Sequence, residues 1–253
     1  QGMVNEIMTI LEEIWYGKHH FEVAVLLRNA LLVSSMLCNA EAWYNTSKYD
    51  IEMLEKVDEQ LLRKILKAPS KTPKEMLFLE LGCIPLRLII RSKIMNFLHY
   101  ILNQPSESIV NKVFVEQVKS PNRNDWIKLI EQDIEVLRIE LSYDEIKNMS
   151  KYSFKSLIKK KTIKAALAYL NKLKKKHSKV ENIDHPNLTI QAYFSADDSD
   201  KTIKNIQDLF KIRSRLTEVK TNMKGNYTNY NCDECKIIGR INEDKQEHLL
   251  YFP

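Results

Sequence analysis

Glycine is scarce in this sequence, and its scarcity limits the folds that the chain can adopt. The 253 residues contain only five glycines, at positions 2, 17, 82, 225 and 239, and each stands alone. Dinucleotide-binding loops and P-loops need several glycines a few residues apart, because their backbones approach phosphate closely. The sequence therefore excludes both phosphate-binding loops. With few alternating β-branched runs and 28% charged residues, it predicts an all-α fold.

Apolar residues recur every three or four positions through most of the chain, which predicts a series of amphipathic helices. Residues that can cap a helix amino end stand between these runs, and proline or glycine marks several ends. Thr72-Pro73, for instance, predicts a helix with Thr72 as its cap and Pro73 as its first residue. The first five predicted helices cover 3–14, 21–45, the stretch from a Ser47 cap to Pro69, the stretch from Thr72 to Gly82 and the stretch from Pro85 to Gln104. The next four are 107–119 capped by Ser106, 125–137 capped by Asn124, a short turn that begins at Ser142, and 151–176 capped by Ser150. A linker over 177–200 precedes the last predicted helix, 201–217.

Composition shifts along these runs divide the chain into four predicted parts. A helical bundle over 1–104 precedes a helical connector over 105–180, which contains a basic helix. A linker and a helix follow over 181–220, and a polar, turn-like tail covers 221–253. The chain begins with Gln1-Gly2 and ends soon after a pair of cysteines, so we expect it to be a piece of a longer product.

Cysteine use and hydropathy indicate where such a chain resides. Its four cysteines form no disulfide framework and no signal peptide stands at the start, which favours a reducing, intracellular compartment. The longest apolar stretch, 21–38, is interrupted by Glu22 and Arg28, so we expect no segment that spans a membrane.

Positive charge is concentrated in one part of the chain. The segment 146–180 contains twelve lysines and no acidic residue, and the rest of the chain is net negative. A solvated helix face is the commoner meaning of a lysine run, but acidic residues usually alternate with the lysines of such a face. The other interpretation is a polyanionic partner, RNA or DNA. The lysines expected to contact phosphate are Lys155, Lys159, Lys160, Lys161, Lys164, Lys172, Lys174, Lys175, Lys176 and Lys179.

A possible zinc module lies near the end of the sequence. Cys232 and Cys235 are followed by His248, with twelve residues between Cys235 and His248, which is ligand spacing for one small zinc site. A structural site needs a fourth donor, and the spacing places it at position 252, which is Phe252. An oxygen donor from Glu243-Asp244 is one substitute; the alternative is a decayed or truncated zinc knuckle. We expect zinc at well under one ion per chain.

Two further patterns resemble active sites only superficially. Phe194-Ser195-Ala196-Asp197-Asp198 has the outline of a polymerase carboxylate pair, but a polar linker follows it, and a helix amino end explains its acidic residues. None of the six histidines belongs to a recognisable nucleophile arrangement. The sequence predicts no catalytic residue in this chain.

Several runs, taken in their order along the chain, resemble one family. They include Asn39-Ala40-Glu41-Ala42-Trp43-Tyr44, Thr72-Pro73-Lys74-Glu75, Leu79-Glu80-Leu81-Gly82, Leu209-Phe210-Lys211-Ile212-Arg213-Ser214-Arg215 and Gln246-Glu247-His248-Leu249-Leu250. Together they resemble the region after the palm domain in non-LTR (LINE-type) retrotransposon endonuclease–reverse transcriptases. The resemblance covers nearly the whole chain.

The resemblance implies a thumb-like helical bundle, a basic connector and a CCHC zinc knuckle, which hold RNA and DNA during target-primed reverse transcription. It adds Arg213 and Arg215 to the expected nucleic-acid contacts and makes Cys232, Cys235 and His248 the knuckle ligands. The polymerase aspartates of the family lie in the palm, so no catalytic residue is transferred here. The implied partners are the upstream palm and endonuclease domains, and the implied location is the nucleus. Our leading hypothesis is a non-catalytic, nucleic-acid-binding fragment; the alternatives are a helical scaffold for acidic protein partners and a non-functional relic.

Overall fold

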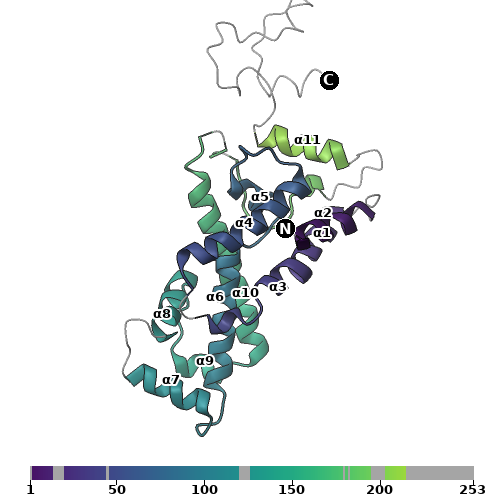
Figure 1. Ribbon diagram of the computed structural model, residues 1–253. Helices are drawn as coiled ribbons and strands as arrows, with labels where there is room; N and C mark the ends of the chain where they lie inside the picture. The colour runs from purple at the N-terminus through teal and green to yellow at the C-terminus, as the bar shows by residue number, and fades with distance from the viewer. Residues whose placement is uncertain are drawn as a thin grey trace, which may run out of the picture.

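The chain is mostly helical, as the sequence predicts. The computed structural model describes residues 2–13, 20–43, 46–119, 126–178, 180–181, 183–194 and 203–214 (Figure 1). Over these ranges it contains no β-strand, and its one extended pairing is an isolated antiparallel bridge between Leu81 and Ile190. The predicted tail over 221–253 lies outside the described residues.

The helices begin close to the predicted positions. The α-helices are α1 (Gly2–Glu13), α2 (His20–Leu27), α3 (Ser34–Met36), α4 (Lys48–Leu66), α5 (Lys74–Glu80), α6 (Leu86–Leu102), α7 (Ile109–Lys119), α8 (Trp126–Leu137), α9 (Tyr143–Asn148), α10 (Lys151–Lys174) and α11 (Ile203–Arg213). A π-helical turn, η1 (Arg28–Val33), joins α2 to α3, and η2 (Ala40–Ala42) and η3 (Ala192–Phe194) are short 3-10 turns.

Capping side chains fix several of these helix starts. Ser47 and Ser142 each form the predicted capping box, with Asp50 and Glu145 as the reciprocal partners, and Ser150 accepts a bond from the Ser153 amide. Two predicted caps are wrong. Pro73, not Thr72, is the residue that precedes α5, and the Thr72 hydroxyl has no hydrogen-bond partner. The start of α7 is capped by Ser108, whose oxygen accepts from the Asn111 amide, in place of Ser106.

The predicted helix over 21–45 is shorter than expected and contains an irregular turn. It runs from His20 through η1 to Met36, and a left-handed residue, Asn39 with φ of 54°, follows its end. A π turn inserts one extra residue into the helix and shifts the faces on either side of it. In this chain the turn begins at Arg28, which is buried on the same face as Phe21 and Ala24, and both Leu32 and Val33 are buried after it.

Gly82 ends α5 in a conformation that few other residues could adopt. Its φ is +63°, and the amides of Gly82 and Cys83 donate to the carbonyls of Leu79 and Phe78, which closes a Schellman motif. A Cβ atom at this position would lie 2.5 Å from the carbonyl carbon of Thr189. Gly82 therefore both ends the helix and lets the segment that contains Thr189 pass close beside it.

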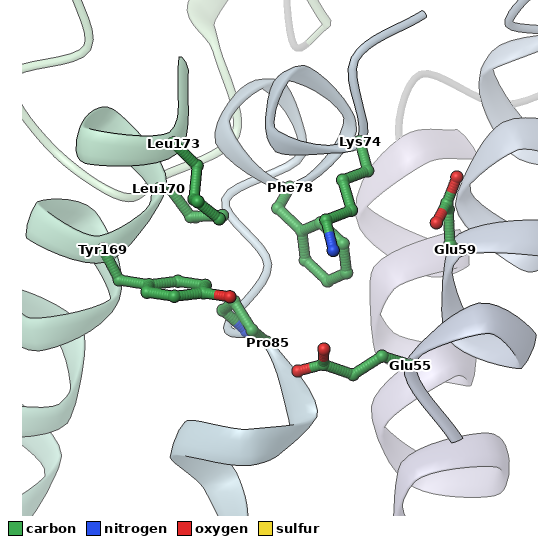
Figure 2. A pocket seen from close by; sticks show the side chains of 8 residues that line it. All are labelled: Glu55, Glu59, Lys74, Phe78, Pro85, Tyr169, Leu170 and Leu173. Carbon is green, nitrogen blue, oxygen red and sulfur yellow. The ribbon is translucent and has the colours of Figure 1, made fainter. Parts of the chain in front are cut away.

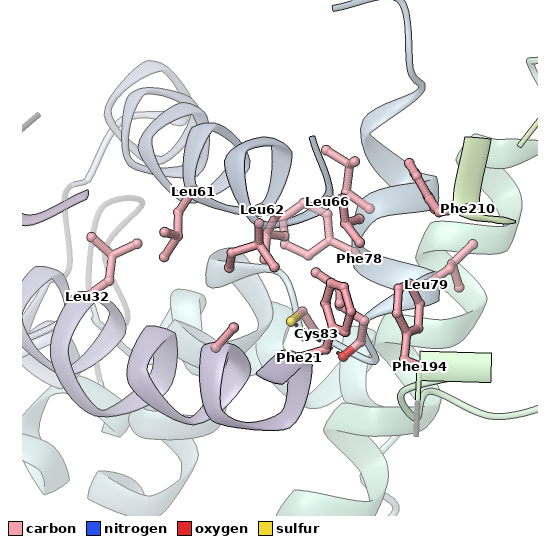
Figure 3. Packing of buried hydrophobic residues seen from close by; sticks show 14 of the residues in the cluster. Phe21, Leu32, Leu61, Leu62, Leu66, Phe78, Leu79, Cys83, Phe194 and Phe210 are labelled. Atoms are coloured by element: carbon pink, nitrogen blue, oxygen red, sulfur yellow. Dashed lines mark hydrogen bonds between the residues drawn. The ribbon is translucent and has the colours of Figure 1, made fainter. Parts of the chain in front are cut away.

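Two hydrophobic cores lie at opposite ends of the longest helix, α10. The first core gathers α1, α2, α4, α5, the segment 188–194 and α11, and Figure 3 shows its aromatic and leucine side chains interlocked. The second core gathers α6, α7, α8 and α9 around the first half of α10. Helix α6 packs along α10 (Figure 1), so this pair connects the two cores. Members of the first core include Ile7, Leu11, Phe21, Leu61, Leu62, Leu66, Leu79, Ala166, Leu170, Phe194 and Phe210, and members of the second include Leu86, Ile94, Leu98, Phe114, Ile130, Leu137, Ile146, Phe154 and Ile158.

Candidate nucleic-acid interface

One side of α10 is buried along its whole length. Its buried residues are spaced four apart, and each step of four turns about 40° past one full rotation, so the buried row winds slowly round the helix. The first half of the row enters the second core and the second half enters the first core. The helix is therefore held at both ends. The row consists of Phe154, Ile158, Thr162, Ala166, Leu170 and Lys174.

The opposite side of α10 presents lysines to solvent. Lys160, Lys164 and Lys172 occupy the row that faces away from the buried one, and all three are exposed. From Lys160 to Lys172 this row covers about 18 Å at 1.5 Å per residue, which matches the axial rise of about five base pairs. Lys155 and Lys159 lie on the flank, and Lys175 and Lys176 follow the helix end. In the part of the chain that the structure describes, none of these seven ammonium groups forms an ion pair with a carboxylate.

Three of the predicted contact residues form hydrogen bonds with other groups of the protein. The Lys161 ammonium donates to the Arg138 carbonyl at 2.6 Å, at the end of α8. Lys174 is 4% exposed and donates to the Ile183 carbonyl, and burial lowers the pKa of its ammonium group. Arg213 donates through Nε to Glu80 at 2.8 Å. We therefore leave these three out of the candidate interface, whereas Lys179 and Arg215 lie outside the described residues.

A cavity of about 400 Å³ opens beside the first half of α10. Its walls come from η1, the turn after Gly82, α6 and α10, and no acidic residue is among those that line it. Lys155 and Lys159 are the two lysines that line it, and the buried residue Thr162 lies beside them on α10. The lining residues are Arg28, Asn29, Val33, Gly82, Cys83, Ile84, Ile89, Ser92, Asn96, Lys155, Lys159 and Thr162.

One lining residue of this cavity, Arg28, belongs to a buried ion pair. The guanidinium of Arg28 is 1% exposed and donates from Nε and Nη2 to the two oxygens of Asp58, at 2.6 and 2.5 Å. It also donates to the Ile84 carbonyl at 3.0 Å and to the Asn29 side-chain oxygen at 2.9 Å. The pair neutralises both charges. Its hydrogen bonds connect η1 with α4 and with the turn before α6.

The residues that line the cavity include one thiol and no histidine or carboxylate. Cys83 is its only lining thiol, and burial raises the pKa of that thiol to about 11, so the thiolate nucleophile is absent at neutral pH. Neither a histidine nor a carboxylate lines the cavity to act as a base. The arrangement is therefore suited to binding.

A second, smaller cavity has a different character. It measures about 20 Å³, enough for about one water molecule, and Glu55, Glu59 and Lys74 lie around it. Figure 2 shows Tyr169 of α10 and Glu55 of α4 reaching toward Pro85 from opposite sides. Arg87 donates to Glu55 at 2.7 Å and stacks over the Tyr169 ring at 5.2 Å. The cavity is part of the packing between α4, α5 and α10.

A network around Glu80 was not predicted from the sequence. Its carboxylate is fully buried and accepts bonds from His185 at 3.0 Å, Tyr193 at 2.7 Å and Arg213 at 2.8 Å. Although burial disfavours the carboxylate, the hydrogen bond from His185, the charge of Arg213 and the other bonds together lower the pKa of Glu80. The only sequence signal is an acidic residue inside the apolar run 76–84. The network attaches the segment 185–193 and α11 to α5.

The predicted metal ligands have no counterpart in the described structure. Over the described ranges no group of three or more His, Cys, Asp or Glu side chains could hold a metal ion. Cys232, Cys235 and His248 lie outside these ranges.

Among the described helices, none is both long and apolar enough to cross a membrane. Comparison with known proteins finds no matching family model, no similar curated protein and no similar solved structure.

Proposed function

We propose that this chain is a non-catalytic, nucleic-acid-binding region of a LINE-type reverse transcriptase, namely the part that follows the palm. In this proposal the described helices form a thumb-like bundle with a basic connector, and the tail with Cys232, Cys235 and His248 is a zinc knuckle. Nuclear location and association with upstream palm and endonuclease domains belong to the same proposal. The sequence resemblance supports these points, and the geometry of α10 supports the binding role.

The single observation that carries the binding role is the exposed lysine row of α10. Lys160, Lys164 and Lys172 point away from the protein on a helix that two cores hold in place, and no described carboxylate neutralises them. An ammonium group binds phosphate as a point charge and reads no base edge. The expected ligand is therefore RNA or DNA bound through its backbone, with little dependence on sequence.

Salt dependence tests this role directly. With about five phosphates neutralised, a plot of log K against log salt concentration should have a slope of about −3.5 to −4.5. Changing Lys160, Lys164, Lys172 and Lys176 to glutamine should make the slope shallower by about 3. A matched control changes four exposed lysines on other helices, Lys48, Lys56, Lys112 and Lys119, and removes the same charge.

The two variants separate a specific interface from overall positive charge. The binding role predicts that the control variant keeps the parental salt slope, whereas the slope of the α10 variant becomes shallower. Equal slopes in both variants would remove the lysine row from the interface, and a parental slope near zero would refute nucleic-acid binding itself.

A protein-binding scaffold is the second candidate function, and the surface of α7 favours it. Ile109 is 79% exposed and Val113 51% exposed, and Val110, Val115 and Val118 are also exposed on this helix. Exposed apolar side chains gathered on one element are typical of protein interfaces. Competition distinguishes the two functions, because a short RNA duplex should displace a partner held by α10 and leave a partner held by α7 bound.

A further inference from the structure

The cavity beside α10 has the size and chemistry of a site for one nucleotide. Its volume of about 400 Å³ is within the range of about 300–1,000 Å³ usual for small-molecule sites. A helix or a duplex would not enter such a space, whereas one base with its sugar would. The cavity also lies on the same helix as the exposed lysine row.

The polar groups in the cavity walls are suited to the edge of a base. The Asn29 side-chain oxygen accepts from Arg28, which leaves its amide NH₂ group to donate. Asn96 donates to the Ser92 carbonyl, which leaves its side-chain oxygen to accept. Both side chains line the cavity, so together they offer one donor and one acceptor to a base edge.

The remaining walls are suited to the faces of a base and to a phosphate. Val33, Ile84 and Ile89 give an apolar surface on which a flat ring can lie. Lys155 and Lys159, one turn apart on α10, are the exposed cations at the cavity, and no carboxylate lining it competes for them. Lys159 directly precedes Lys160, where the exposed row begins.

We propose that the cavity binds one unstacked nucleotide, with its base against the apolar wall and the Asn29 and Asn96 side chains and its phosphate on Lys155 and Lys159. This inference rests on the proposed function where the nucleotide belongs to a strand, because the following phosphates then continue along the row from Lys160. A free mononucleotide presents the same chemistry, and the experiment distinguishes the two sources.

The test uses the full chain, adenosine monophosphate, and a single-stranded oligonucleotide with one central 2-aminopurine. No aromatic residue lines the cavity, so a 2-aminopurine that leaves its stacked neighbours and enters it should fluoresce more strongly. Asn96→Leu should weaken binding of the monophosphate by about 3- to 10-fold, the effect of one neutral hydrogen bond. The double change Lys155→Gln and Lys159→Gln should weaken it by about 10- to 100-fold.

A charge-matched control changes Lys172 near the end of α10 and Lys176 just after it, neither of which lines the cavity. It should make the salt slope of oligonucleotide binding shallower and leave the 2-aminopurine signal unchanged. Thermal melting of each variant confirms folding. Because Asn96→Leu keeps the approximate size of the side chain, it is the variant least affected by misfolding.

The outcomes separate this inference from the proposed function. A fluorescence increase that Asn96→Leu reduces supports the nucleotide site. The natural ligand is a strand if the monophosphate fails to compete with the oligonucleotide, and a free nucleotide if it competes equally well. Steep salt-dependent oligonucleotide binding, without a fluorescence change and without saturable monophosphate binding below about 10 mM, overturns the site and leaves the lysine row intact. Monophosphate binding without oligonucleotide binding supports the site and refutes the proposed function.

Discussion

Removing one member of the buried Arg28–Asp58 pair should destabilise the chain severely. The two side chains are 1% and 0% exposed, and each is the other's main partner. Asp58→Asn leaves a guanidinium buried beside a neutral amide, and Arg28→Met leaves a carboxylate without its cation. Each single change should cost about 3–5 kcal/mol, because an unpaired buried charge keeps its desolvation cost. That is a large part of the total stability of about 5–15 kcal/mol that is usual for a domain.

The double variant tests whether the loss of stability in each single variant is caused by the charge that is left unpaired. With both charges removed, no unpaired charge remains, and the loss should be well below the sum of the two single losses. We expect a coupling of at least about 2 kcal/mol in the double-mutant cycle. Urea unfolding followed by circular dichroism measures all four free energies of unfolding. Additive losses within about 0.5 kcal/mol would show that the two side chains act independently and would refute the reasoning.

Three further predictions follow from single residues. Burial raises the pKa of Asp133 to about 6 despite the charge of Arg91, so its contribution to stability is fully present below about pH 3 and is lost as the pH rises through 6. Between pH 4 and 7.5 the parent should lose about 2 kcal/mol that Asp133→Asn retains, measured by urea unfolding. Gly82→Ala should cost at least about 2 kcal/mol in the same assay, because φ is +63° and the new Cβ meets the Thr189 backbone; an unchanged midpoint would contradict this. Metal analysis should find well under one zinc per chain and more in Phe252→Cys, and full occupancy in the parent would contradict the incomplete ligand set.

The local features of this fold could be predicted from sequence. Helix starts at Ser47, Ser142 and Ser150 depend on hydrogen bonds that span three residues, and they lie where the capping signals place them. The position of the lysine row also follows from helical spacing, because the residues opposite a buried row are exposed. These features need no knowledge of what packs against the helix.

Contacts between distant residues could not be predicted in this way. The burial of Lys174 depends on the Ile183 carbonyl, and that of Arg28 on Asp58, which is thirty positions away. The π turn that begins at Arg28 has no recognisable sequence signal. The Glu80 network likewise joins three segments that only the tertiary fold brings together, so neither it nor the cavity over Arg28 was predicted.

The two kinds of basic residue are used differently, and this bears on the kind of binding to expect. Arg28, Arg87 and Arg213 each pair with a carboxylate within the protein. A guanidinium is suited to such sites, because its planar fork matches a carboxylate and it is weakly hydrated. On the exposed face of α10, every basic residue is a lysine. Because arginine is the usual reader of guanine edges, a face without it should bind phosphate at any sequence, and affinity should vary little among oligonucleotides of equal length and structure.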